Sequence, residues 1–290
     1  MNDLNAIMMT SSHGGTQGVY RHASTSTGAD MTFSVFVPDH TESASLPVVW
    51  YLSGLTCTHA NVTEKGEFRR ACAELGLIFV APDTSPRGAG VPDDPDGAYD
   101  FGLGAGFYVD ATEAPFEATY RMWSYVTAEL PALIGANFPA DMARQSIMGH
   151  SMGGHGALTI ALRLPERFRA VSAFSPIVAP SRVPWGEKAL GGYLGSDRAA
   201  WRKHDAVALI EDGARLPEIL VDQGTADEFL ERQLRPDLLR EACADAGIDL
   251  TLNLREGYDH SYYFISTFMA EQLRWHAKRL DRPVATLIRP

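Results

Sequence analysis

SIMGHSMGGHGAL, residues 146–158, places one serine, Ser151, among four glycines directly after a short apolar run. Residues 149–153 fit the pattern G-x-S-x-G of a nucleophile elbow, in which a strand turns sharply into a helix and holds a serine hydroxyl above the sheet. Glycines are needed because side chains at the flanking positions would collide with the turn. A flexible turn can also match so short a pattern, but the preceding apolar strand and the following helical pattern favour an elbow.

The rest of the chain alternates between strand-like and helical patterns. Near-continuous apolar runs, typical of strands buried on both faces, begin at residues 31, 47, 77, 145, 170, 218 and 249. Helical patterns occupy residues 63–76, 116–138, 152–164, 231–247 and 261–280. This alternation predicts an α/β fold with a mostly parallel central sheet flanked by helices on both faces, and the elbow makes it an α/β-hydrolase fold.

Length and composition limit the classes of protein to consider. The 290 residues are expected to form one domain over 1–290, with about 1–18 and 281–290 as peripheral tails. Because the start lacks a signal-peptide pattern and no run approaches the ~18 apolar residues of a membrane span, we expect a cytoplasmic protein without a membrane partner. A net charge of -11 without a basic segment argues against nucleic acid as a partner. The three cysteines form no CxxC pair and are expected to be free thiols.

A serine nucleophile requires a base and an orienting carboxylate, which follow in the order Ser, Asp, His in this fold. Residues 218–229, EILVDQGTADEF, offer Asp222 and Asp227 for the acid. Asp222 lies inside the apolar run, whereas Asp227 lies beyond its end, where functional groups of α/β folds gather. We therefore choose Asp227, and His260 as the base, because it lies on the loop between the last strand and the last helix.

The oxyanion of the reaction requires two backbone N–H donors, one from the residue after the nucleophile and one from a loop after an earlier strand. Met152 supplies the first, and Leu55, after Gly54, is expected to supply the second. The segment GLGAG, residues 102–106, lacks the spacing of a dinucleotide-binding loop, and no phosphate-binding or metal-ligand pattern is present, so we expect no cofactor and no metal. It lies in a Pro/Gly-rich loop over residues 84–115, whose length predicts a functional role.

Beyond these motifs, the chain resembles the S-formylglutathione hydrolases, also called esterase D, from about residue 19 to about residue 276. The resemblance rests on the segments SGLTCT, APDTSPRG, YDFGLGAGFYVDAT, MGHSMGGHGAL, PWGEKALGGYLG, DQGTAD and GYDHSYYFISTF. It implies the same nucleophile, acid, base and oxyanion donors as the analysis above. It also implies a serine esterase that hydrolyses the thioester S-formylglutathione to glutathione and formate in formaldehyde detoxification, and a homodimer. A general short-chain carboxylesterase or an acyltransferase on the same scaffold is the alternative.

Residues near the expected pocket are candidates for substrate binding: Cys57, Lys65, Trp185 and Lys188. Cys57 is interpreted either as a thiol near the active site or as a small buried residue, the commoner fate of a free cysteine. Trp185, with Tyr99, Phe101 and Phe107, is expected to crowd the site and favour short acyl groups. Lys65, Arg87 and Lys188 are the basic side chains that could attract an anionic substrate to this acidic protein.

Overall fold

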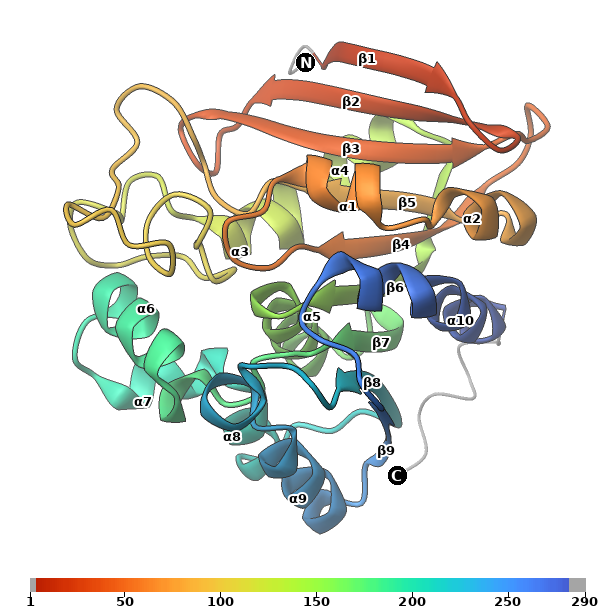
Figure 1. The fold of residues 1–290 in the computed structure, drawn as a ribbon. Coiled ribbons are helices and arrows are strands. Elements are labelled where there is room, and N and C mark those ends of the chain that lie inside the picture. The colour runs from red at the N-terminus through yellow and green to blue at the C-terminus, as the bar shows by residue number, and fades with distance from the viewer. Residues whose placement is uncertain (1–3, 282–290) are drawn as a thin grey trace.

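The computed structural model describes residues 4–281, and residues 1–3 and 282–290 lie outside the described part. One sheet of nine strands, in the order β1-β2-β3-β5-β4-β6-β7-β8-β9, forms the centre of the molecule (Figure 1). The strands are β1 (Asn5–Ser11), β2 (Gly15–Ala23), β3 (Asp30–Pro38), β4 (Leu46–Leu52), β5 (Ile78–Pro82), β6 (Ala140–His150), β7 (Phe168–Phe174), β8 (Glu218–Gly224) and β9 (Asp249–Arg255).

The sheet is antiparallel from β1 through β3 to β5 and parallel from β5 to β9. The predicted strands coincide with β3 to β9, and the predicted mostly parallel sheet is confirmed. Residues 1–18, expected as a peripheral tail, instead contain β1 and the start of β2. β1 is an edge strand whose seven residues are all exposed, so it lacks the alternation of buried and exposed residues that identifies a strand in a sequence. The other predicted tail, from residue 281, lies almost wholly outside the described residues.

Helices cover both faces of the sheet, as predicted. On one face, α1 (His59–Lys65), α2 (Arg69–Leu75) and α10 (Tyr262–Leu280) pack on a buried cluster that includes Phe68, Phe79 and Phe264. The other face carries α4 (Leu130–Asn137), α5 (Met152–Arg163), α8 (Ala206–Glu211) and α9 (Pro236–Ala246), over a larger cluster. Further helices are α3 (Met122–Ser124), α6 (Pro184–Leu194) and α7 (Arg198–Trp201), with short 3-10 or π turns η1 (Tyr125–Glu129), η2 (Pro180–Arg182), η3 (Arg202–His204) and η4 (Leu230–Leu234).

Three predicted helices are shorter than their patterns. The helix expected over 63–76 is divided between α1 and α2, where Glu67 has a φ of 51° that no helix allows. The pattern over 116–138 becomes helical only at Met122. Arg235, with a φ of 52°, separates η4 from α9. In the first and third cases a residue with a positive φ interrupts the helical pattern.

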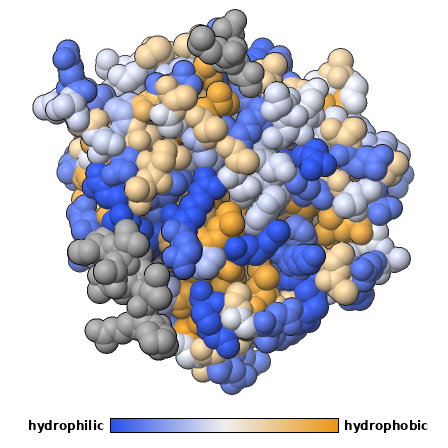
Figure 2. All heavy atoms as spheres, turned by 180° about the vertical axis from the view of Figure 1, so that it is seen from behind, coloured by the Kyte–Doolittle hydropathy of each residue, from blue (hydrophilic) through white to orange (hydrophobic). Residues whose placement is uncertain are grey.

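The surface seen from behind mixes hydrophilic and hydrophobic side chains without one continuous apolar face (Figure 2). Among the helices of residues 4–281, none combines the length and the hydropathy that a membrane crossing requires.

Candidate active site

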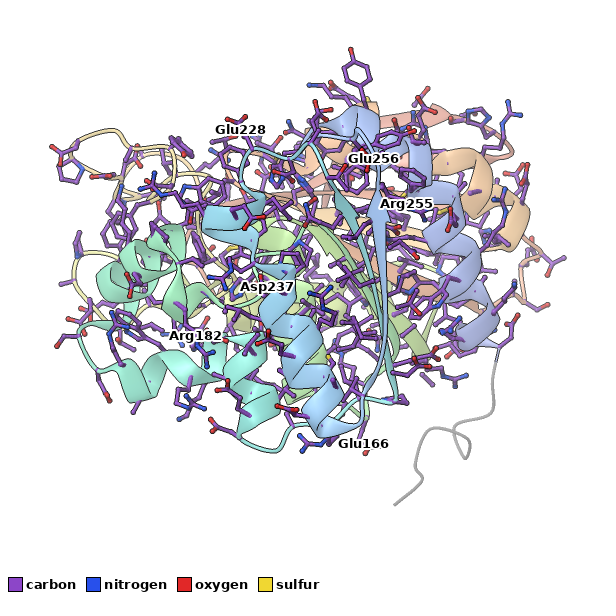
Figure 3. All side chains as sticks on the ribbon, turned by 60° about the horizontal axis from the view of Figure 1, so that its bottom comes forward. Glu166, Arg182, Glu228, Asp237, Arg255 and Glu256 are labelled. Carbon is purple, nitrogen blue, oxygen red and sulfur yellow. The ribbon has the colours of Figure 1, made fainter. Side chains whose placement is uncertain are left out.

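The predicted site residues lie at one edge of the sheet. Ser151 follows β6, Asp227 follows β8, His260 follows β9, and residues 53–57 follow β4. These strands are parallel, so their carboxyl ends share an edge, where ligands of α/β folds bind. Figure 3 shows Glu228 and Glu256, from the loops after β8 and β9, at one end of the sheet, and Glu166, from the turn before β7, at the opposite end.

Ser151 has the strained backbone of a nucleophile elbow. It is the N-cap of α5 with φ 57° and ψ -117°, and it is 2% exposed. The glycines on either side are required by the turn: a Cβ atom on Gly149 would lie 2.2 Å from the Gly153 carbonyl oxygen, and one on Gly153 would lie 1.9 Å from the Leu52 carbonyl oxygen. Since these contacts are with backbone atoms, no side-chain movement relieves them. The turn therefore explains the G-x-S-x-G pattern sterically.

Asp227 and His260 are joined by a hydrogen bond. Nδ1 of His260 lies 2.6 Å from Oδ2 of Asp227, whose side chain is fully buried. Because a carboxylate only accepts, the proton of this bond belongs to Nδ1, which leaves Nε2 as a proton acceptor. The Asp227 carboxylate also accepts the Phe229 N–H at 2.9 Å and the Gln223 side-chain amide at 3.3 Å. These two supporting residues were not identified from the sequence, because their roles depend on the course of the loop after β8.

Asp222, the other candidate acid, is directed elsewhere. Its buried carboxylate accepts hydrogen bonds from Arg255 at 2.6 Å, Gln272 at 2.7 Å and Asn253 at 3.1 Å. These partners come from β9 and α10. Asp222 therefore joins β8 to its neighbours, and of the two candidates Asp227 is the one that contacts His260.

Residues 53–57, which we call the oxyanion loop, lie against Ser151. A Cβ atom on Gly54 would lie 3.1 Å from the Cβ of Ser151, so this glycine allows close approach of the two segments. The loop turns tightly, with Cys57 N–H donating to the Gly54 carbonyl at 3.3 Å and Thr56 at φ 66°. Among residues 4–281, no acceptor receives a hydrogen bond from the backbone N–H of Leu55 or Met152. The two predicted oxyanion donors are thus available to a ligand.

The long loop over residues 84–115 supports the oxyanion loop. Thr56 N–H donates to the Gly104 carbonyl at 3.0 Å, and the Cys57 carbonyl accepts from the hydroxyl of Thr84 and, at 3.1 Å, from Arg87. Gly104 N–H is in turn held by the Ser85 hydroxyl at 2.9 Å. The segment containing GLGAG is therefore a structural support for the oxyanion loop. The sequence indicated a functional loop here but not which residues make these contacts.

His150, beside the nucleophile, is a neutral neighbour of His260. The two rings lie 4.4 Å apart between centroids, and His150 is buried. Burial, followed by the proximity of His260, holds the pKa of His150 well below its usual range. Within the described residues, neither ring nitrogen of His150 has a hydrogen-bond partner, so it does not connect to Asp227.

The Cys57 thiol is buried in the oxyanion loop. Burial raises its pKa, although Tyr262, Lys65 and Arg87 act in the opposite direction. Since the thiolate is the reactive form of cysteine, this environment keeps Cys57 a weak nucleophile.

Trp185 reaches the site through a row of aromatic rings. Its ring lies 4.6 Å from that of Phe229, which lies 5.0 Å from that of His260. The indole N–H donates to the hydroxyl of Tyr99, an exposed side chain of the long loop, at 3.1 Å. Phe101 and Phe107, which belong to the same loop and were expected to crowd the site, have their side chains in the buried core cluster instead. The structure thus places Trp185, Tyr99 and Phe229 on the side of His260, with Phe229 the member that the sequence analysis omitted.

The candidate basic residues differ in their surroundings. Lys188, on α6, lies 2.6 Å from Asp100 and 3.4 Å from Asp94, and the Asp100 hydrogen bond raises its pKa. Its charge is therefore compensated within the protein. Lys65 ends α1 with its side chain exposed, and Arg87 is bonded to the Cys57 carbonyl and lies 4.0 Å from Asp83.

Comparison with known proteins places this chain among esterases. Residues 24–275 match the protein family described as "Putative esterase". The chain is 53% identical over 269 residues to the S-formylglutathione hydrolase of Paracoccus denitrificans, covering 93% of this chain and 95% of that protein. It is 50% identical over 281 residues to the S-formylglutathione hydrolase of Mus musculus, covering 96% of this chain and 99% of that protein.

A solved structure gives the same result in three dimensions. The S-formylglutathione hydrolase of Agrobacterium tumefaciens is 62% identical and superposes with a TM-score of 0.94, covering 95% of this chain and 99% of the solved one. The expected α/β-hydrolase fold is thereby confirmed.

Proposed function

Since the chain belongs to the S-formylglutathione hydrolase family of esterases, we propose that Ser151, Asp227 and His260 form the catalytic triad with which it hydrolyses its thioester. The family inferred from the sequence motifs is confirmed by these relatives. The chain is accordingly a serine hydrolase that cleaves S-formylglutathione to glutathione and formate, the step that completes glutathione-dependent detoxification of formaldehyde.

The observation that carries the assignment of residues is the hydrogen bond of 2.6 Å between Asp227 and His260. It fixes the tautomer in which Nε2 accepts a proton, which is the state that a serine nucleophile needs. The elbow geometry of Ser151 supports the same arrangement, because Met152 directly follows Ser151 in the chain and the oxyanion loop that contains Leu55 lies close to Ser151 at Gly54.

In the acylation half of the reaction, Ser151 Oγ attacks the formyl carbon while its proton passes to Nε2 of His260. The carbonyl oxygen becomes an oxyanion, which the N–H groups of Leu55 and Met152 stabilise. The carbon–sulfur bond then breaks, and the departing glutathione sulfur takes the proton from Nε2 of His260, so glutathione leaves as the thiol and His260 is neutral again. A cysteine thiol has a pKa of about 8.5, far below that of an alcohol, so the bond can break before this proton transfer is complete.

In the deacylation half, His260 takes a proton from water as the water oxygen attacks the formyl-serine. The oxyanion forms again at the same two N–H groups, and its collapse releases formate and returns the proton to Ser151 Oγ. Neutral His150 adds no positive charge beside the imidazolium that forms transiently on His260. The two halves need no group beyond those of the chain, the thioester and water.

The test is steady-state hydrolysis of S-formylglutathione by the purified protein, with simple aryl esters of short acids as comparison substrates. We expect kcat/KM to be highest for the formyl thioester, and Ser151→Ala to remove activity on all substrates. A higher kcat/KM on aryl esters would favour the alternative, a general short-chain carboxylesterase.

We further propose that the protein forms a homodimer in the cytoplasm. The exposed edge strand β1 presents Ile7, Met8 and Met9, which are 48%, 42% and 61% exposed, and unpaired edges of this kind pair readily with another chain. Three free cysteines suit the reducing compartment in which glutathione is abundant. Sedimentation velocity is expected to detect a dimer, and Met9→Lys is expected to weaken it; a wild-type monomer at all concentrations would contradict the proposal.

A further inference from the structure

A buried tyrosine links the oxyanion loop to the helix that follows the nucleophile. The hydroxyl of Tyr108, a residue of the long loop that is 1% exposed, donates to the Ser53 carbonyl at 2.8 Å. Ser53 is the first residue of the oxyanion loop, so this bond fixes the peptide group that precedes Gly54 and Leu55. We propose that Tyr108 is a positioning residue that keeps the Leu55 N–H directed at the oxyanion, an inference that rests on the proposed function.

The backbone of Tyr108 is strained, and a second buried residue holds it. Phe107 and Tyr108 have consecutive positive φ values of 46° and 52°, a backbone conformation that is strained for residues other than glycine. The Phe107 carbonyl accepts a hydrogen bond of 3.0 Å from Nε2 of His155, which is 1% exposed. Burial lowers the pKa of His155 to about 4, so a neutral imidazole with its proton on Nε2 makes this bond.

His155 belongs to α5, whose first residue is Met152. Met152 carries one oxyanion donor at the start of the helix. Through His155, Phe107 and Tyr108, the same helix is connected to the loop that carries the other donor, Leu55. The two N–H groups, although far apart in the sequence, are therefore both held in place by α5. An oxyanion site requires such fixed donors, because its preorganisation depends on them.

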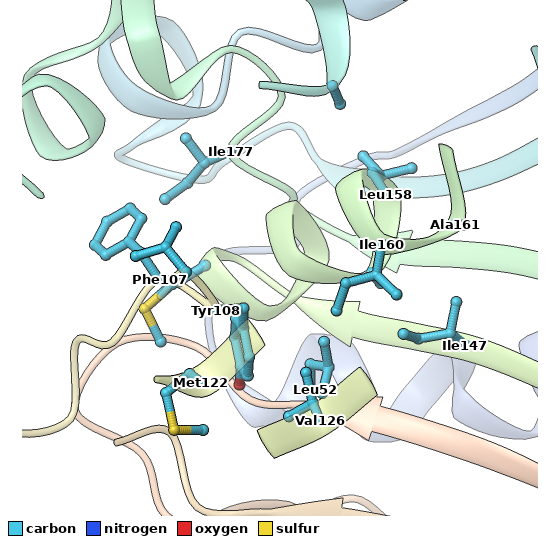
Figure 4. Close-up of a cluster of buried hydrophobic side chains, with 14 of the residues drawn as sticks. Leu52, Phe107, Tyr108, Met122, Val126, Ile147, Leu158, Ile160, Ala161 and Ile177 are labelled. Atoms are coloured by element: carbon cyan, nitrogen blue, oxygen red, sulfur yellow. The ribbon is translucent and has the colours of Figure 1, made fainter. Parts of the chain in front are cut away.

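Packing strengthens this connection. A Cβ atom on Gly156 of α5 would lie 2.6 Å from Cδ2 of Tyr108 and 3.0 Å from Cδ1 of Leu52, so the tyrosine ring lies directly against the helix backbone. Figure 4 shows Tyr108 in the buried cluster with Phe107, Leu52 and Met122. Gly156 therefore allows the close packing of Tyr108 against α5 and is not required by the turn at Ser151.

The test is Tyr108→Phe, which removes the hydroxyl and keeps the ring. Among residues 4–281, Tyr108 supplies the side-chain donor to the Ser53 carbonyl, so the variant frees the Ser53–Gly54 peptide to reorient. We expect kcat on S-formylglutathione to fall about tenfold with KM unchanged, less than the 10²–10³ lost when an oxyanion donor is removed outright. The pH profile should keep its shape because His260 is untouched. Binding of a boronic acid that forms a tetrahedral adduct at Ser151 should weaken by a similar factor.

Tyr120→Phe is the matched control. Tyr120 is also fully buried, and its hydroxyl donates to a backbone carbonyl, that of Pro92, at the same distance of 2.8 Å. Thermal unfolding of both variants separates lost stability from lost positioning. The proposal is overturned if Tyr108→Phe keeps the wild-type kcat, if both variants lose kcat equally, or if the loss appears in KM alone. A wild-type protein without activity on S-formylglutathione would instead refute the proposed function.

Discussion

Replacing Asp227 by asparagine tests whether activity depends on which ring nitrogen of His260 carries the proton. In the native site, Oδ1 of Asp227 accepts the Phe229 N–H at 2.9 Å, and Oδ2 faces His260 Nδ1 at 2.6 Å. An asparagine keeps its carbonyl oxygen on the Phe229 N–H, because that backbone group cannot turn, and so directs its NH₂ group at His260. The Gln223 amide can rotate to accept from this group, since its own Oε1 is buried without a partner among the described residues. Nδ1 of His260 must then accept, and its proton moves to Nε2, the atom that should receive the Ser151 proton.

The expected loss is about 10⁴-fold in kcat, the effect of the same exchange in a serine protease triad, or about 5 kcal/mol of transition-state stabilisation. KM for S-formylglutathione should change little, because Asp227 is fully buried behind His260. The measurement is steady-state hydrolysis, with circular dichroism to verify folding. Asp222→Asn is the matched control, since it alters a buried carboxylate of β8, the strand that precedes Asp227, and this carboxylate bonds to Arg255 and Gln272 instead of His260. Our reasoning fails if Asp227→Asn stays within tenfold of wild type, or if Asp222→Asn loses as much kcat per folded molecule.

Three other predictions concern stability and specificity. Burial lowers the pKa of His155 to about 4 and those of His204 and His276 to about 3, so the unfolded chain takes up protons below about pH 6.5 that the folded chain refuses. Each of these three histidines should therefore lower the free energy of unfolding by about 2 kcal/mol as the pH falls from 6.5 to 5. Urea unfolding that shows no loss of stability at pH 5 would contradict this. Trp185→Ala should raise the ratio of kcat/KM for a hexanoyl ester to kcat/KM for an acetyl ester by about tenfold or more, because it removes a bulky ring that packs against Phe229. An unchanged ratio would place the acyl pocket elsewhere. Lys65→Ala should raise KM for S-formylglutathione more than KM for a neutral formyl thioester, and added salt should reduce this difference. Lys188→Ala should have a smaller effect, because Lys188 is already paired with Asp94 and Asp100. Equal effects of the two variants would locate glutathione recognition elsewhere.

The sequence predicts the parallel part of this sheet well, for a physical reason. Strands β4, β5, β7 and β8 are buried along almost their whole length, and β6 is buried over its second half, so each contains an apolar run that ends where a loop begins. β1 and β2 give no such signal: β1 is exposed along its length, and β2 contains Gly15 and Gly18. Their pairing depends on backbone hydrogen bonds and on the neighbouring strand β3, information that no local pattern contains.

The same distinction applies to the site. The order of Ser151, Asp227 and His260, each beyond the end of a predicted strand, is enough to predict that they share one edge of the sheet. The supporting contacts depend on the loop over residues 84–115, whose backbone has no periodicity, and a pattern cannot reveal that Tyr108 approaches Ser53 or that Gly104 approaches Thr56.

The glycines of residues 146–158 show how one motif can carry two constraints. Gly149 and Gly153 are required by the elbow, where a side chain would meet backbone within 2.2 Å and 1.9 Å. Gly154 and Gly156 have other neighbours: a Cβ atom would lie 2.8 Å from Pro176 at the first and 2.6 Å from Tyr108 at the second. A sequence pattern records all four as equivalent, yet only the first pair shapes the nucleophile. The second pair allows the segments after β7 and around Tyr108 to pack against α5, so the helix that begins at the nucleophile is also the element against which the surrounding loops are positioned.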